Sequence, residues 1–340
     1  MNKILIVRLG ALGDIVHAIP VAAALRRAWP AAQIHWVVAP RHREILELVP
    51  VVDRLIPFDD RAALAIVRQL RRERYDAALD LQGLIKSAVI ARLAGARRVI
   101  GFNRKYARES PASLLYSEAF DPGGEGIYAP SETRHVVRIN LGLLERLGIA
   151  DPAIEFPIAA APSSVADALR VQAAGRYAIL NPGAAWPNKR WPPDRLAALA
   201  RALRDRHQLA SVVVWGPGER DLAEQAVAAA DGSAILSPAT TIADIVALAR
   251  GAALMVSGDT GPTHIAAAVG TPLVGIYGPT RPERNGPFLP DDETVSRASI
   301  CECHHLRECR RGRMCLLDIE VGEVLAAAER RLAAAGRPRV

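Results

Sequence analysis

The 340-residue sequence has no uncharged hydrophobic run that approaches the roughly 20 residues a membrane-spanning helix needs. The longest candidate, from Ile265 to Thr280, is interrupted by two prolines and three glycines. At the N-terminus, Arg8 ends a short apolar run and Gly-Ala-Leu-Gly-Asp follows, a pattern typical of a first strand and not of a signal peptide. We therefore expect a soluble, cytoplasmic protein.

Several familiar ligand-binding motifs are also missing. Gly10 and Gly13 do not have the G-x-G-x-x-G spacing of a dinucleotide fingerprint, and no Gly-Lys-Ser/Thr follows them to make a P-loop. The sequence contains no Asp-x-Asp pair of the kind that holds Mg²⁺ on a diphosphate. Aromatic residues make up only 5% of the chain and no nucleic-acid motif appears, which argues against a nucleic acid partner. The absence of short-period repeats excludes solenoids and propellers.

Lysine is scarce: only four of the 43 Lys and Arg residues are lysines, and the net charge is +7. The distribution of the basic residues is more informative than their number, because seven of them and no acid lie between Lys86 and Arg108. Such a block indicates an acidic partner, either a phosphorylated or carboxylated substrate or an anionic membrane surface. The alternative is a solvated helix face followed by a loop.

What the chain does contain is a regular alternation of apolar runs and helical patterns. Half of its residues are hydrophobic, enough to build two domains with separate cores. We expect strands at residues 4–7, 34–38, 54–57, 77–81, 98–101, 177–180, 211–215, 254–256 and 272–277. We expect helices at residues 15–28, 41–48, 61–73, 86–93, 133–147, 194–206, 221–230, 242–249 and 264–269. The pattern predicts an α/β protein with two doubly wound parallel-sheet domains, residues 1–160 and 161–340.

Two stretches do not fit this alternation. Residues 103–130 are rich in Gly, Pro and Ser, and we expect an irregular loop there. Residues 152–162 are rich in Pro and Ala and are the best candidate for the linker between the domains.

The most informative stretch is the loop Ser257-Gly258-Asp259-Thr260-Gly261, which joins a buried strand to a short helix. Its backbone N–H groups and those of the helix N-terminus can bind an anion. Asp259, Thr260 and His264 lie at this end of the helix. The alternative is an ordinary turn in which Asp259 or Thr260 caps the helix. Ligands bind at the carboxyl ends of strands in such sheets, where residues 8–14, 181–192 and 215–219 form further loops.

Five segments together resemble the bacterial ADP-heptose:lipopolysaccharide heptosyltransferases, glycosyltransferase family 9. They are Leu12-Gly13-Asp14, residues 80–87, residues 107–116, Lys189-Arg190-Trp191-Pro192, and residues 257–261 with His264. The resemblance extends from Ile4 to about Pro282, and residues 80–87 and 107–116 look most like heptosyltransferase I. It implies a GT-B fold, in which two Rossmann-like domains face each other across a cleft. The N-terminal domain would bind the acceptor and the C-terminal domain the nucleotide-sugar donor.

The resemblance also implies roles for residues on the acceptor side. Asp14 corresponds to the general base that takes the acceptor hydroxyl proton in an inverting transfer, although an N-cap role is the alternative. Arg104, Lys105 and Arg108 are expected to bind the carboxylate and phosphate groups of Kdo and lipid A. His17, one turn beyond Asp14, either borders the same site or is a buried structural histidine.

On the donor side, the resemblance makes Lys189 the cation that neutralises the pyrophosphate, with a solvated surface lysine as the alternative. Asp259 would orient its loop or bind the sugar and would not contact the phosphates, because its carboxylate and a phosphate are both anions and would repel each other. The remaining donor assignments are Thr260, Gly261 and His264 for the diphosphate, Glu219 for the ribose, Thr240 and Thr241 for the adenine, and Gly13 for a close backbone approach. We expect transfer to require no metal ion.

All four cysteines lie in one short segment, as Cys301, Cys303, Cys309 and Cys315. In a cytoplasmic protein such clustering suggests a metal before a disulfide, although the spacing is not the paired C-x₂-C of ordinary zinc ribbons. A structural zinc or iron ion, with His304 or His305 as substitute ligands, is one hypothesis, and free or redox-active thiols are the other. The cluster departs from the heptosyltransferase I pattern, which leaves the acceptor open.

The sequence therefore predicts an inverting glycosyltransferase that transfers L-glycero-D-manno-heptose from ADP-heptose. The predicted acceptor is the Kdo region of a lipopolysaccharide inner-core precursor of the Kdo-lipid A type. The protein would lie peripherally on the anionic inner face of the cytoplasmic membrane. The alternatives are a heptosyltransferase II or protein-O-heptosyl relative, a nucleotide-sugar epimerase of the same fold, and a non-catalytic nucleotide-sugar-binding module.

Overall fold

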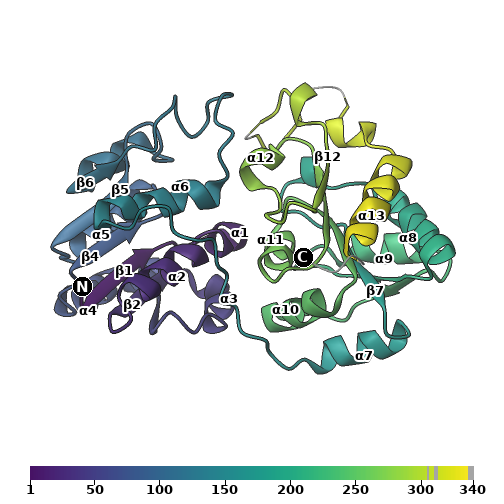
Figure 1. Cartoon of the computed structure of the whole chain (residues 1–340), viewed down its shortest axis with the longest axis horizontal. Coiled ribbons are helices and arrows are strands. Elements are labelled where there is room, and N and C mark those ends of the chain that lie inside the picture. The colour runs from purple at the N-terminus through teal and green to yellow at the C-terminus, as the bar shows by residue number, and fades with distance from the viewer. Residues whose placement is uncertain (305, 310–312, 336–340) are drawn as a thin grey trace. The chain divides into compact units, whose positions relative to one another are not determined.

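The computed structural model describes residues 1–304, 306–309 and 313–335. The chain divides into two compact units, Met1–Ala159 and Ala160–Val340, each with its own parallel sheet (Figure 1). Over the described ranges, no helix combines the length and hydrophobicity that crossing a lipid bilayer would take. Two six-stranded parallel sheets with helices confirm the predicted α/β class.

The first unit contains a sheet in the order β3-β2-β1-β4-β5-β6. Its strands are β1 (Lys3–Val7), β2 (Gln33–Val38), β3 (Arg54–Pro57), β4 (Ala77–Asp80), β5 (Arg98–Phe102) and β6 (Glu118–Phe120). Ile4 of β1 pairs with Ile34 on one side and Ala77 on the other, and its strand is almost wholly buried. Its helices are α1 (Leu12–Val16), α2 (Ile19–Ala28), α3 (Arg43–Glu47), α4 (Ala63–Arg72), α5 (Ile85–Leu93) and α6 (Val136–Gly142).

Two expectations for the first unit were wrong. The single helix predicted at residues 15–28 is two helices, because Pro20 has no N–H to continue a helix and instead lies in the first turn of α2. The segment 103–130 is not irregular throughout, since it holds the 3₁₀ helix Ser110–Leu115 and the edge strand β6. Strand β6 is joined to β5 by a bidentate ion pair in which Arg98 Nε lies 2.6 Å from Glu118 Oε1.

The second unit repeats the same topology, with its sheet in the order β12-β11-β10-β7-β8-β9. Its strands are β7 (Tyr177–Asn181), β8 (Ala210–Val213), β9 (Ala234–Leu236), β10 (Leu254–Gly258), β11 (Leu273–Tyr277) and β12 (Glu293–Ser296). Its helices are α7 (Ser164–Gln172), α8 (Pro193–His207), α9 (Arg220–Ala228), α10 (Ile242–Gly251), α11 (Gly261–Ala268), α12 (Pro282–Asn285) and α13 (Val321–Ala335). The sequence did not predict β9, β12, α7, α12 or α13, and it started α11 three residues late.

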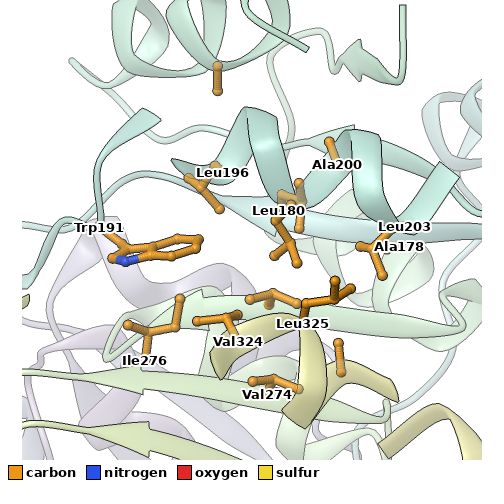
Figure 2. Close-up of a cluster of buried hydrophobic side chains, with 14 of the residues drawn as sticks. Ala178, Leu180, Trp191, Leu196, Ala200, Leu203, Val274, Ile276, Val324 and Leu325 are labelled. Atoms are coloured by element: carbon orange, nitrogen blue, oxygen red, sulfur yellow. The ribbon is translucent and has the colours of Figure 1, made fainter. Parts of the chain in front are cut away.

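The core of the second unit fixes the loop that carries Lys189. Trp191 lies among the aliphatic side chains of the sheet and of α8 and α13, including Ile276 and Val324 (Figure 2). Its indole Nε1 donates to the carbonyl of Ile319 at 3.1 Å. Because a buried tryptophan anchors the end of this loop, the lysine two residues earlier has a defined position.

Candidate active-site residues

Each sheet has a point where the strand order reverses direction, between β1 and β4 in the first unit and between β7 and β10 in the second. Ligands of doubly wound sheets bind beyond the carboxyl ends of the strands at this point. The loops predicted to carry the chemistry follow three of these four strands: residues 8–14 follow β1, residues 182–192 follow β7, and the Asp259 loop follows β10. The topology therefore supports the selection of these loops.

Asp14 is the third residue of α1 and is held by two arginines. One carboxylate oxygen, Oδ2, lies 2.8 Å from Arg8 Nη2 and 2.8 Å from Arg108 Nη2. The same oxygen accepts a bond from the Ala11 backbone N–H at 3.2 Å. Arg8 has only 3% of its side chain exposed and also donates to the carbonyl of Leu81, whereas Arg108 is 31% exposed. Arg8 is thus a fixed structural partner and Arg108 the accessible one.

The two arginines determine the charge state of Asp14. Burial by itself would raise the pKa of the Asp14 carboxyl, but the positive charges of Arg8 and Arg108 outweigh it and hold the pKa well below its ordinary value. Burial also lowers the pKa of Arg8 to about 10, which leaves it charged at neutral pH. Asp14 is therefore ionised throughout the neutral range, as a proton acceptor must be.

Arg108 was predicted to bind the acceptor, and the structure brings it to Asp14. Arg104 and Lys105, its predicted partners, are exposed on the loop that follows β5. His17 is buried, with its ring edge-to-face against His135 at 5.4 Å and its carbonyl accepting from Asn140 Nδ2 at 3.3 Å. The structural alternative for His17 therefore fits this position.

Two polar residues that fix the Asp14 loop, residues 8–14, were not predicted as site residues. Arg8, described above, gives no sequence signal beyond interrupting an apolar run. Asp80, at the end of β4, accepts bonds from the backbone N–H of Gln82 at 2.8 Å, from Ser87 Oγ at 2.9 Å and from Tyr116 Oη at 2.8 Å. Gln82 Oε1 in turn accepts from the Leu9 N–H at 2.7 Å. Asp80 thereby ties β4 and α5 to the loop that carries Asp14, although burial raises its pKa.

Replacing Arg108 with glutamine is expected to move the acid limb of the kcat/KM profile to higher pH. Loss of one positive charge raises the pKa of Asp14, so protonation removes the ionised form at a higher pH than in the wild type. The same shift weakens stability in acid, since a carboxyl with a depressed pKa stabilises the fold above its unfolded pKa of about 4 and loses that effect as pH falls through its folded pKa. The measurement is the pH profile of initial rates, with Arg104→Gln as the control on the same loop. An unchanged acid limb would contradict the pairing.

In the second unit, Asp259 bridges Lys189 and His264. Lys189 Nζ lies 2.6 Å from Asp259 Oδ2, and His264 Nε2 lies 3.0 Å from Asp259 Oδ1. Lys189 Nζ also lies over the ring of Trp186, 4.6 Å from its centroid. All three members of the bridge are largely buried, so a solvated surface lysine is excluded for Lys189. Asp259 therefore fixes the positions of the Lys189 ammonium and the His264 ring.

The charge of Asp259 is also set by its partners. Burial would raise the pKa of the Asp259 carboxyl, but the bond from His264 and the charge of Lys189 outweigh it and lower the pKa well below its ordinary range. Asp259 is thus ionised and neutralises Lys189 in the structure. An arriving phosphate would compete with this carboxylate for the lysine.

The start of α11 leaves backbone groups at the same place. Thr260 occupies the N-cap position, but its hydroxyl bonds to Asn181 Nδ2 at 3.0 Å and to Thr263 Oγ1 at 2.9 Å. The first turn offers the N–H groups of Gly261 and Thr263, which a helix cannot satisfy internally, whereas Pro262 between them has no N–H. The geometry therefore suits an anion held by backbone amides rather than by the Thr260 hydroxyl.

The predicted ribose-binding residue, Glu219, lies against the loop that follows β7. Its Oε2 accepts from the Gly216 N–H at 3.1 Å, and a Cβ on Gly183 would lie only 2.0 Å from the same oxygen. Gly183 is therefore needed for Glu219 to adopt this position. The adenine-site candidates differ, because Thr241 caps α10 through a bond from the Asp244 N–H at 3.1 Å while Thr240 precedes the cap. Gly13 is the second residue of α1, next to Asp14 in the first unit.

The cysteines form a cluster at the end of the second unit. Cys301, Cys303 and Cys315 are buried together with Cys309 packed against them, and the sulfurs of Cys301 and Cys303 are 3.2 Å apart. Burial raises the pKa of Cys303 to about 12, which keeps its thiol protonated. His304 Nδ1 bonds with the Pro279 carbonyl at 2.8 Å.

The donor chemistry of this cluster suits zinc or iron, but its arrangement does not form a metal site as it stands. Within residues 1–304, 306–309 and 313–335, no three His, Cys, Asp or Glu side chains are placed so as to hold an ion. His305, the other predicted substitute ligand, lies outside the described residues.

Comparison with known proteins adds to this geometry. Residues 63–314 match glycosyltransferase family 9 (heptosyltransferase). Lipopolysaccharide heptosyltransferase 1 of Pseudomonas aeruginosa is 30% identical over 306 residues, which cover 84% of this chain and 81% of that protein. The structure of the Escherichia coli heptosyltransferase WaaC with ADP superimposes with a TM-score of 0.76 at 24% identity, covering 97% of this chain and 99% of that one. The structure of E. coli ADP-heptose lipopolysaccharide heptosyltransferase II gives a TM-score of 0.77 at 22% identity, covering 99% and 100%, so the fold does not distinguish the two.

Proposed function

Because the chain belongs to glycosyltransferase family 9, the heptosyltransferase family, we propose that this glycosyltransferase moves L-glycero-D-manno-heptose from ADP-heptose to the Kdo region of a lipopolysaccharide precursor. The heptosyltransferase 1 relative at 30% identity favours this acceptor. The observation that carries the mechanism is the ionised Asp14 carboxylate, in the first helix after the central strand β1, held by one buried and one accessible arginine.

On the acceptor side, we propose that Asp14 takes the proton of the attacking hydroxyl. A carboxylate with a depressed pKa is a weak base, so proton transfer is favourable only late, when the new bond to the anomeric carbon has made the hydroxyl acidic. Arg108 shares the same carboxylate oxygen and is accessible, so an anionic group of the acceptor would compete for it. Such competition would raise the basicity of Asp14 only when acceptor is bound. The stereochemical outcome is inversion, since one carboxylate acting as base supports a single displacement.

On the donor side, we propose that Lys189, His264 and the first amides of α11 bind the diphosphate, and that Glu219 binds the ribose. Negative charge on the departing ADP grows in the transition state, so a fixed cation lowers the barrier as well as the dissociation constant. Asp259 holds Lys189 and His264 in position until the donor arrives. We propose that these groups take the place of a divalent cation.

The test is ADP release from ADP-heptose with and without a Kdo-lipid A acceptor. Release that depends on the acceptor supports the proposal, and heptosylation of a mono-heptosylated acceptor instead would assign the chain to the heptosyltransferase II reaction. Transfer to a protein acceptor would favour a protein-O-heptosyl relative. Isomerisation of the donor without acceptor would support the epimerase alternative, and binding without turnover the non-catalytic module. Addition of EDTA is expected to leave the rate unchanged.

We also propose that the four cysteines hold a structural zinc or iron ion, apart from the transfer chemistry. Three buried thiols packed together in the fold support this, and their sulfurs would have to move to reach ligand distance and lose their protons. Elemental analysis of protein purified without chelator is expected to give about one metal ion per chain. A Cys301→Ser/Cys303→Ser variant should lose that metal, and metal-free wild-type protein would refute the site.

A further inference from the structure

Helices α4 and α5 lie next to each other on one face of the first sheet. Ile66 and Leu70 of α4, Ile90 and Ala91 of α5 and Ala94, which follows α5, belong to one hydrophobic cluster with the central strands. Their opposite sides face solvent, and we call these outward sides the α4–α5 face. Helix α5 begins just after β4, at the same edge of the sheet as the Asp14 loop.

The outward side of α5 is unusual for a solvated helix. Its exposed residues are Ile85, Lys86, Val89, Arg92 and Leu93, while Ser87, Ala88, Ile90 and Ala91 are buried. The spacing of the exposed residues puts three large apolar side chains in one stripe with two cations beside them. The 3₁₀ helix Ser110–Leu115 packs against α5, and its Leu114 is 85% exposed.

The outward side of α4 also combines exposed apolar side chains with cations. Its exposed residues are Leu64, Ala65, Arg68, Arg71 and Arg72, and Leu64 is 76% exposed. The side chain of Arg71 reaches α5, since its Cγ lies 3.2 Å from the position that a Cβ on Gly95 would take. The cations of α4 therefore border the apolar stripe of α5.

Neither helix contains an acidic residue. Three acids beside the two helices have other partners: Asp60 Oδ1 lies 2.5 Å from Lys86 Nζ, Glu109 Oε2 accepts from the Ile85 N–H at 2.7 Å, and Glu73, just after α4, pairs with Lys3 and Arg54. The α4–α5 face therefore combines exposed aliphatic side chains with arginines whose charge is not balanced within the two helices.

We propose that the α4–α5 face docks the enzyme on an anionic lipid bilayer, with the aliphatic side chains inserted at the headgroup level and the arginines on lipid phosphates. Apolar side chains flanked by Lys and Arg are the composition of helices that lie in a membrane interface. A second copy of the chain fits less well, because the face would bring its own arginines against one another. This proposal rests on the proposed function, since it explains how an enzyme with a lipid-linked acceptor reaches it.

The test is co-sedimentation of the full chain with vesicles, comparing phosphatidylethanolamine with 30% phosphatidylglycerol against phosphatidylcholine alone. We expect binding to the anionic vesicles, lowered about tenfold or more in Leu64→Ser/Ile85→Ser/Leu93→Ser. Arg68→Gln/Arg72→Gln is also expected to lower binding about tenfold, with a weaker dependence on salt. Controls in the second unit are Val171→Ser, at a side chain with 81% exposure, for the loss of exposed apolar side chains, and Arg176→Gln/Arg204→Gln for the arginine pair. Both controls should bind like wild type.

Equal binding to both kinds of vesicle, or wild-type binding by the triple variant, would overturn the proposal. A change of oligomeric state without a change in vesicle binding would show that a second copy covers the face instead. Turnover separates this proposal from the proposed function: the variants should act normally on a Kdo acceptor without acyl chains and poorly on the same acceptor embedded in vesicles. An enzyme inactive on both acceptors would refute the function and leave the vesicle result valid.

Discussion

Replacing Asp14 with asparagine is expected to lower kcat by about 10²–10⁴-fold, the usual contribution of a positioned general base. The asparagine keeps the size and an acceptor oxygen but cannot take the proton. Because the proposed donor residues belong to the second unit, the dissociation constant for ADP should change by less than about twofold. The measurements are initial rates with saturating donor and ADP binding by calorimetry.

The same substitution has a stability cost that the sequence alone does not reveal. Arg8 is 3% exposed and would keep its charge without its carboxylate partner, which costs about 3–5 kcal/mol. A fall in melting temperature therefore accompanies the loss of turnover, and rates have to be measured well below it. Asp151→Asn is the matched control, since Asp151 is highly exposed with a positive φ of 39° that asparagine tolerates. Near wild-type turnover in folded Asp14→Asn protein would end the assignment of Asp14 as the base.

The elements that could be predicted are those whose own residue pattern fits only a strand or only a helix. Strands such as β1 and β10 are buried on both faces, so their unbroken apolar runs identify them, and helix-period patterns identify α8 and α10. Three of the four edge strands, β6, β9 and β12, were missed; they have only three or four residues and half-exposed patterns, and the edge strand β3, of similar length, was predicted. Such segments become strands because a neighbour offers free backbone groups, which local sequence does not encode.

In the candidate site, too, local sequence identifies some residues, whereas their contacts depend on the fold. Asp14, Lys189 and Asp259 could be selected because they follow central strands in motifs with a family resemblance. Their pairing could not be predicted, because the ion pairs of Asp14 with Arg108 and of Lys189 with Asp259 join residues 94 and 70 positions apart in the chain. Both sites contain a buried carboxylate whose pKa burial alone would raise and whose two side-chain partners lower it, two arginines for Asp14 and Lys189 with His264 for Asp259. The physical role of each aspartate depends on those partners.

Replacing Lys189 with methionine is expected to lower kcat/KM for ADP-heptose by about 10²–10³-fold. The substitution removes the cation from the departing diphosphate and leaves the Asp259 carboxylate, with only His264 as partner, to repel it. The second effect predicts that Lys189→Met/Asp259→Asn recovers part of the loss, since neither charge then remains. Kinetics of the two single variants and the double variant form a cycle that measures this coupling.

Arg220→Met provides the control for the Lys189 substitution, because Arg220 also lies over a tryptophan, Trp215, and pairs with an acid, Glu224, but is exposed. It should leave kcat/KM near the wild-type value. If the double variant were as impaired as the product of the two single effects, the bridge would have no role in donor binding and Lys189 would act alone. A recovery of tenfold or more over Lys189→Met would instead mean that Asp259 opposes the diphosphate whenever its lysine is missing. Its place at the site would then follow from what it does before the donor arrives, which is to hold Lys189 and His264 ready.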